Sequence, residues 1–128
     1  MKSIINSFIC ADHDPLDSYQ PEDMNMFHFW VEISVGIEGE EGEDLYQVSI
    51  CSQKWIEERI KENTFFVGLY TIIIQKYDYD NICQTLNRLF CIEGKNYEEI
   101  FTKLGQIGLS EYQKVTYDTD APYMAFRK

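Results

Sequence analysis

The chain has 128 residues, of which 45% are hydrophobic and 15% aromatic, and 11 basic residues against 22 acidic ones give a formal net charge of −11. This composition excludes a disordered chain and predicts one domain over residues 1–128, while the acidity argues against nucleic-acid binding. We expect no membrane span and no signal peptide, because no window approaches eighteen continuous apolar residues and the N-terminal apolar stretch is short.

The negative charge is concentrated in the first part of the chain. Residues 1–53 hold eleven acids and one base, Lys2, a net charge of −10, whereas residues 54–128 hold eleven acids and ten bases, a net charge of −1. Self-repulsion of this size opposes compaction, and solubility needs far less charge. A folded segment with charge of one sign therefore predicts a partner that presents a basic protein surface.

The first part of the chain predicts three strands and two connections. Residues 2–10 resemble a strand, and residues 11–25 form an acidic loop without periodicity that contains two prolines. Residues 27–35 and 45–51 alternate apolar and polar side chains, which predicts an antiparallel hairpin, joined by the long, glycine-containing connection 36–44. The side chains expected to be buried together are Phe29, Val31, Ile33, Val48 and Ile50.

A helix and a further strand are expected next. Ser52 is placed to cap a helix that runs to about Glu62. We expect three of its side chains to point inward, namely Trp55, Ile56 and Ile60. Residues 69–77 are β-branched and apolar on both faces, which predicts a central strand covered by helices.

Two amphipathic helices and a final strand complete the expected elements. Asp80 is placed to cap a helix with an apolar stripe at Ile82, Leu86, Leu89 and Phe90. Asn96 is placed to cap a third helix that ends at Gly105 and Gly108, with Tyr97, Ile100, Phe101 and Leu104 inward. Residues 112–126 are expected to add a last strand. The fold class is therefore α+β: a mainly antiparallel sheet with about three helices packed on one face.

The acidic connection is the first candidate site. Its five acids are Glu38, Glu40, Glu41, Glu43 and Asp44. A calcium loop needs oxygen ligands at alternate positions, and the adjacent glutamates break that alternation. A solvated hairpin tip and a recognition loop for a basic partner both remain open, and the length of the loop favours recognition.

Other candidate residues carry weaker patterns. Asp12, His13, Asp14 and Asp17 have the residue types of a metal site, but without a second histidine at a helical spacing they indicate a turn. No zinc module and no catalytic nucleophile is indicated by His28 and the cysteines at 10, 51, 83 and 91. We expect the four cysteines to be reduced in a cytoplasmic protein. Trp30 either underlies a helix or is an exposed anchor for a partner.

Several segments resemble one family. Residues 36–46 read GIEGEEGEDLY and residues 48–55 read VSICSQKW, which is similar to the central signature of the immunity protein 8 family. Four further segments also match the family pattern: YQPED at 19–23, YDYD at 77–80, YEEI at 97–100, and Gly108 followed by Glu111-Tyr112. Two positions depart from the family pattern, since Ser52-Gln53 stands in place of Thr-Pro and Tyr97 in place of Trp. The resemblance covers roughly residues 4–113.

The resemblance implies a bacterial immunity protein without catalytic residues, cofactor or metal. Such a protein binds the C-terminal toxin domain of a polymorphic or contact-dependent inhibition toxin in the cytoplasm, and many of these toxins are nucleases with basic clefts. The candidate toxin-binding residues are the five hairpin acids with Asp12, Asp14, Asp17 and Trp30. Two alternatives stay open: a metal-dependent hydrolase that uses Asp12, His13, Asp14 and the hairpin glutamates, and an acidic adaptor that mimics DNA. The oligomeric state is unknown.

Overall fold

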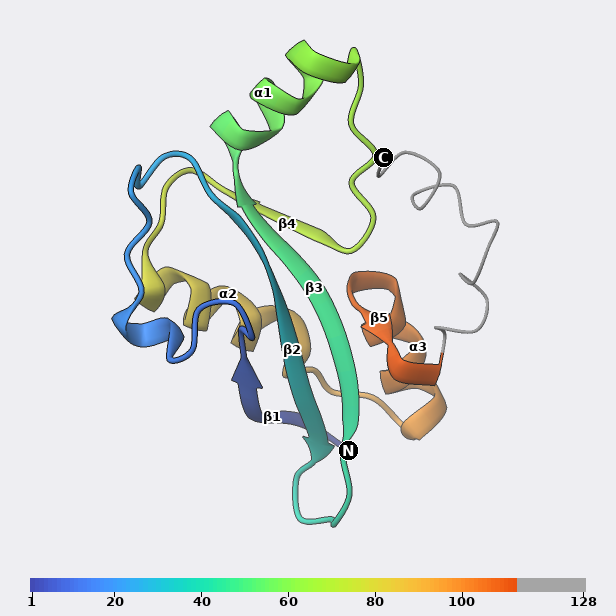
Figure 1. The fold of residues 1–128 in the computed structure, drawn as a ribbon. Coiled ribbons are helices and arrows are strands. Elements are labelled where there is room, and N and C mark those ends of the chain that lie inside the picture. The colour runs from blue at the N-terminus through green and yellow to red at the C-terminus, as the bar shows by residue number, and fades with distance from the viewer. Residues whose placement is uncertain (113–128) are drawn as a thin grey trace.

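The computed structural model describes residues 1–112, which form a five-stranded sheet and three α-helices (Figure 1). The strands are β1 (Ser3–Ile9), β2 (His28–Ile37), β3 (Asp44–Ser52), β4 (Thr71–Ile74) and β5 (Leu109–Ser110). The α-helices are α1 (Gln53–Asn63), α2 (Tyr79–Phe90) and α3 (Tyr97–Ile107), and a 3-10 turn covers Leu16–Ser18. The strand order is β1-β2-β3-β4, and β5 pairs with β3. The expected α+β class and mainly antiparallel sheet are confirmed.

The hairpin β2–β3 forms the centre of the sheet. Its register places Phe29 opposite Ile50 and Val31 opposite Val48. These four side chains and Ile33 are at most 2% exposed, so the predicted register is confirmed. The strands extend further than expected, which shortens the connection to residues 38–43, where Gly39 and Gly42 adopt positive φ angles of 82° and 98°.

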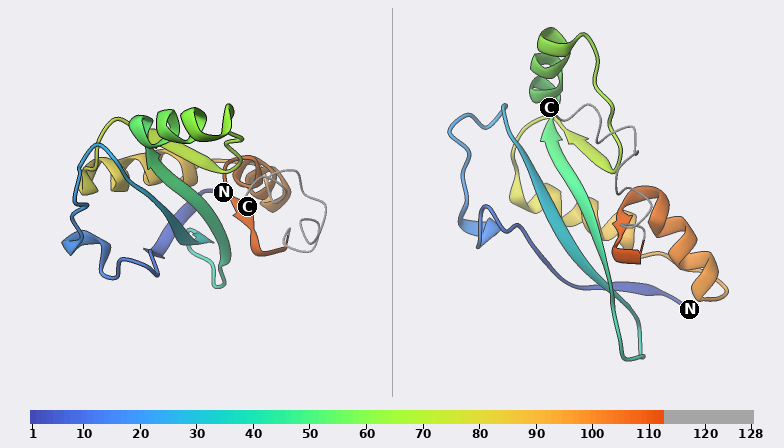
Figure 2. Two further views of the ribbon diagram at one scale, coloured as in Figure 1. Left: turned by 45° about the horizontal axis from the view of Figure 1, so that its top comes forward. Right: turned by 45° about the vertical axis from the view of Figure 1, so that its right-hand side comes forward.

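Helices α2 and α3 cover one face of the sheet (Figure 2). The predicted stripe of α2 is buried at Ile82, Leu86 and Phe90, while Leu89 is half-buried. Ile100 and Leu104 of α3 complete this core. The core therefore lies between one sheet face and two helices, as amphipathic spacing requires.

The helix ends agree with the sequence in part. Ser52 and Asn96 cap α1 and α3, and Gly108 follows α3 as expected. Asp78, rather than Asp80, caps α2 by accepting a hydrogen bond from the Asn81 N–H, so Asp80 lies inside the first turn. Gly105 lies within α3 and does not end it. The last strand expected at residues 112–126 lies almost entirely outside the described residues.

Two predictions are wrong: that three side chains of α1 point into the core, and that residues 69–77 form a central strand. Helix α1 has no buried residue, and Ile60 is 43% exposed. Strand β4 is short, runs parallel to β3 and ends the strand order at one edge, with Ile73 54% exposed. Because α1 begins directly where β3 ends, it projects beyond the sheet, and the two core helices do not reach it (Figures 1 and 2).

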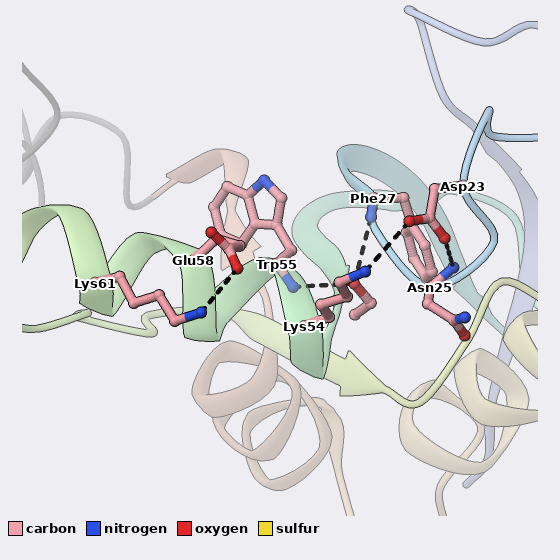
Figure 3. A network of polar contacts seen from close by, with 8 residues as sticks. Asp23, Asn25, Phe27, Lys54, Trp55, Glu58 and Lys61 are labelled. Carbon is pink, nitrogen blue, oxygen red and sulfur yellow. Dashed lines mark hydrogen bonds and ion pairs between the residues drawn. The ribbon is translucent and has the colours of Figure 1, made fainter.

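A small polar network attaches α1 to the rest of the molecule (Figure 3). The Ser52 hydroxyl oxygen accepts hydrogen bonds from the Trp55 N–H at 3.2 Å and the Phe27 N–H at 3.3 Å. Lys54 forms a 3.5 Å ion pair with Asp23, which belongs to the acidic loop before β2. The start of α1 is thus held by a cap and one exposed ion pair.

No helix in the described part of the chain is long and apolar enough to cross a membrane.

Candidate partner-binding surface

The hairpin between β2 and β3 presents the first group of predicted site residues. Glu38, Glu40, Glu41 and Glu43 are exposed in the connection, and Asp44 is half-buried at the start of β3. The connection protrudes from the end of the sheet that is opposite to α1 (Figure 1). The structure therefore brings these five acids together at one end of the molecule.

Two of these glutamates hold the hairpin in place. Glu43 accepts a hydrogen bond from the Ser34 hydroxyl and a 3.4 Å bond from the Asn6 side-chain amide. These bonds, first the one from Ser34, lower the pKa of the Glu43 carboxyl. Glu40 accepts a hydrogen bond from the Tyr97 hydroxyl at the start of α3. The hairpin is thus connected to β1 and to α3, and it presents its remaining acids from a supported position.

A groove of about 550 Å³ lies at the base of the hairpin. It is bounded by β3, by α3 and by the segment that leaves β5. Its lining residues are Asp44, Tyr46, Glu98, Phe101, Thr102, Gly105, Gln106, Ser110 and Tyr112. The groove therefore combines two carboxylates with aromatic rings, and no lysine or arginine is among these lining residues.

Asp44 is an acid of this region whose pKa is raised. Its burial, followed by the neighbouring Glu111 carboxylate, raises its pKa, although a hydrogen bond from the Tyr112 hydroxyl opposes this shift. Burial raises the pKa of Tyr46 as well, with a smaller contribution from the charges of Asp44 and Glu111. The Glu111 carboxylate thus disfavours the ionised form of the partly buried Asp44.

The structure separates Asp12, Asp14 and Asp17 from the hairpin. Strand β1 begins opposite Ile37, next to the hairpin, and runs away from it. The loop that follows β1 reaches Phe29, whose ring lies 5.9 Å from that of His13. Ile37 is eight positions beyond Phe29 on β2, which corresponds to roughly 26 Å at strand spacing. The expectation that these aspartates lie near the hairpin is therefore wrong.

Trp30 belongs to an aromatic cluster under the start of α1. Its ring is half-buried and perpendicular to His28 at 6.3 Å, and His28 stacks on Trp55 at 4.2 Å. Phe66 stands edge-on to Trp55, and the Arg59 guanidinium lies 5.1 Å from the centre of the same indole ring. Trp30 is thus half-buried beside His28, and the choice between its two predicted roles stays open.

The two histidines lie against aromatic rings, and two of the four cysteines are buried. His13 stacks on Tyr19 at 3.7 Å, and all four cysteines are free thiols. Burial is the largest cause that raises the pKa of Cys10 and that of Cys51, the latter to about 11, which opposes the thiolate form. Within residues 1–112, no three histidine, cysteine, aspartate or glutamate side chains gather at a distance suited to a metal ion.

The sequence profile of immunity protein 8 matches residues 4–115, which is most of the chain. The chain belongs to the immunity protein 8 family. It is therefore an immunity protein, and its partner is a cognate toxin. No curated protein and no solved structure matches this immunity protein significantly.

Sequence reasoning missed the groove of this immunity protein 8 family member. It assigned Tyr97 and Phe101 to the interior, but Tyr97 is exposed and stacks on the half-buried Phe101 at 6.0 Å. Glu98 and Tyr112 were not candidates, although both line the groove. The usable signal was their place in the motifs that carry the family resemblance, YEEI and Glu111-Tyr112.

Proposed function

We propose that this immunity protein neutralises its toxin in the cytoplasm by binding the C-terminal toxin domain, a nuclease with a basic surface, through the acidic end of the molecule. The observation that carries this proposal is the supported hairpin with five acids at one end of the sheet. A rigidly presented group of like charges attracts a surface of opposite charge and increases the association rate. The protein acts by occupying its partner's surface, without chemistry of its own.

The proposed role of the hairpin is tested with Glu38→Gln combined with Glu41→Gln. No side-chain partner is found for either acid among the described residues, so these substitutions remove charge and preserve the fold. The association rate with the toxin domain encoded next to this gene should fall roughly two- to fivefold at low salt, with a flatter salt dependence. Stopped-flow fluorescence at several salt concentrations measures both quantities.

The matched control is Glu57→Gln combined with Asp80→Asn, which removes the same charge from α1 and α2. It should retain the association rate and salt dependence of the unmodified protein more closely than the hairpin variant does. Equal effects of the two variants would mean that only the total charge matters. No change in the hairpin variant would place the toxin interface elsewhere on the molecule.

A further inference from the structure

Two walls of the groove beside the hairpin present carboxylates to the same space. Asp44 comes from β3, and Glu98 comes from the first turn of α3. Glu111 adds a third carboxylate near Asp44, where its side chain also accepts a 3.2 Å hydrogen bond from the Leu45 N–H. The nearest cation on the same helix, Lys103, is already paired with Glu99 at 3.2 Å.

Aromatic rings supply the second kind of surface in the groove. Phe101 lies in the groove lining and is backed by Tyr97, whose ring is nearly parallel to it. Tyr112 also lines the groove, is 74% exposed, and donates a hydrogen bond from its hydroxyl to Asp44. A planar cation can therefore lie against a ring while it binds a carboxylate, which is the arrangement that favours a guanidinium over an ammonium group.

The tyrosine at the groove floor offers a further polar group to a ligand. Tyr46 is only 2% exposed, yet it lines the groove, and its hydroxyl is not among the buried polar atoms without a partner, so the groove gives this hydroxyl access to solvent. A buried phenol normally has a polar partner. Burial raises the pKa of this phenol, and the charges of Asp44 and Glu111 contribute less.

We infer that this groove is the socket for an arginine side chain of the toxin domain. The guanidinium would donate to Asp44 and Glu98, stack against Phe101 or Tyr112, and contact the Tyr46 hydroxyl. The volume of about 550 Å³ is in the range of pockets that hold small ligands, so it accepts the side chain together with part of its backbone. The inference rests on the proposed function and adds to it the contact that sets the lifetime of the complex.

The test compares a groove variant, Asp44→Asn with Glu98→Gln, with the hairpin variant and the matched control described above. The dissociation rate from the toxin domain should increase at least tenfold in the groove variant, because it loses the charge pair that is shielded from water. The hairpin variant should change mainly the association rate. Dissociation is followed by competition with excess unlabelled immunity protein, and thermal unfolding confirms that each variant is folded.

Tyr112→Ala gives a second variant that does not disturb the core, since this side chain is largely exposed. It should increase the dissociation rate several-fold. In parallel, arginines of the toxin domain are labelled with phenylglyoxal, and one of them should be protected by the unmodified immunity protein and reactive again with the groove variant. Protection of lysines alone would overturn the assignment of an arginine.

The possible failures can be told apart. If the groove variant dissociates at an unchanged rate while the hairpin variant associates more slowly, the inferred arginine site is overturned. The proposed function would remain intact. Absence of a complex with the unmodified protein would overturn the proposed function. A groove variant that is less stable and dissociates normally would show that the groove holds a segment of the chain itself, which also overturns the inference.

Discussion

Glu43 and Asp44 are adjacent in sequence, but their surroundings shift their pKa values in opposite directions. The Ser34 and Asn6 side chains donate to Glu43, which favours its ionised form. Asp44 is partly buried and lies near Glu111, which disfavours its ionised form. One acid thus contributes to the stability of the hairpin, and its neighbour is held under electrostatic strain inside the groove.

Replacement of Asp44 by asparagine should stabilise the free protein slightly at pH 7. An acid whose pKa is higher in the folded state than in the unfolded chain binds more protons when folded, so its charge lowers stability as the pH rises above the unfolded value. The gain should disappear at a pH below the ordinary aspartate pKa of about 3.9, where both states are protonated. Melting temperatures across this range provide the measurement, with Glu38→Gln as control. A loss of stability at pH 7 would contradict the electrostatic strain.

At the scale of secondary structure, α1 differs from α2 and α3. All three helices have a side-chain cap, from Ser52, Asp78 and Asn96 respectively. Only α1 lacks a buried side chain, so its stability depends on its cap, on exposed ion pairs and on the aromatic contact with His28. Short helices without tertiary packing are marginal in water, and we expect α1 to open without unfolding the sheet.

Ser52→Ala should therefore affect α1 more than α2 or α3, and it also removes the acceptor of the Phe27 N–H just before β2. Loss of the cap costs about 1 kcal/mol, which increases the opening of α1 roughly fivefold. Hydrogen–deuterium exchange of the α1 amides should accelerate by that factor, while the α2 amides keep their rates. Asn96→Ala is the control, because α3 is packed against the core and should not open separately. Equal acceleration across all helices in Ser52→Ala would mean that the molecule opens as one unit.

At the scale of the whole molecule, the buried core and the proposed recognition surface are located in different places. The core lies between the hairpin β2–β3 and the helices α2 and α3. The acids at residues 38–44 lie at the hairpin end of the sheet, and the acids at residues 12–17 lie far from that end. The buried core supports the hairpin, so the four glutamates of its connection can remain exposed to solvent without loss of the fold. The proposed binding of a basic toxin surface requires both properties.

Two substitutions of the same kind separate these regions. Leu86→Ala leaves a cavity under the sheet and should cost about 2–5 kcal/mol of unfolding free energy, since Leu86 is fully buried. Ile60→Ala on α1 should cost less than about 1 kcal/mol, because this side chain is already 43% exposed. Urea denaturation measures both. Similar costs would mean that α1 contributes to the core after all.

The sequence alone was sufficient for features that depend on neighbouring residues. Alternation specified the hairpin and its buried face, helical spacing specified the inner side of α2, and the residues at the ends of helices identified the caps Ser52 and Asn96. Each of these signals is local, because side chains two positions apart on a strand or four apart on a helix share a face. The family signature is likewise a property of linear order.

Only the tertiary structure decided which side chains meet. An apolar strand at residues 71–74 is compatible with the centre or the edge of a sheet, and its place was set by pairing with β3 after α1. The distance between Asp12 and the hairpin followed from the direction of β1. Asp44, Glu98 and Tyr112 form one groove because β5 returns to β3 beside α3. Contacts between residues far apart in the chain depend on this packing, and no local pattern in the sequence encodes them.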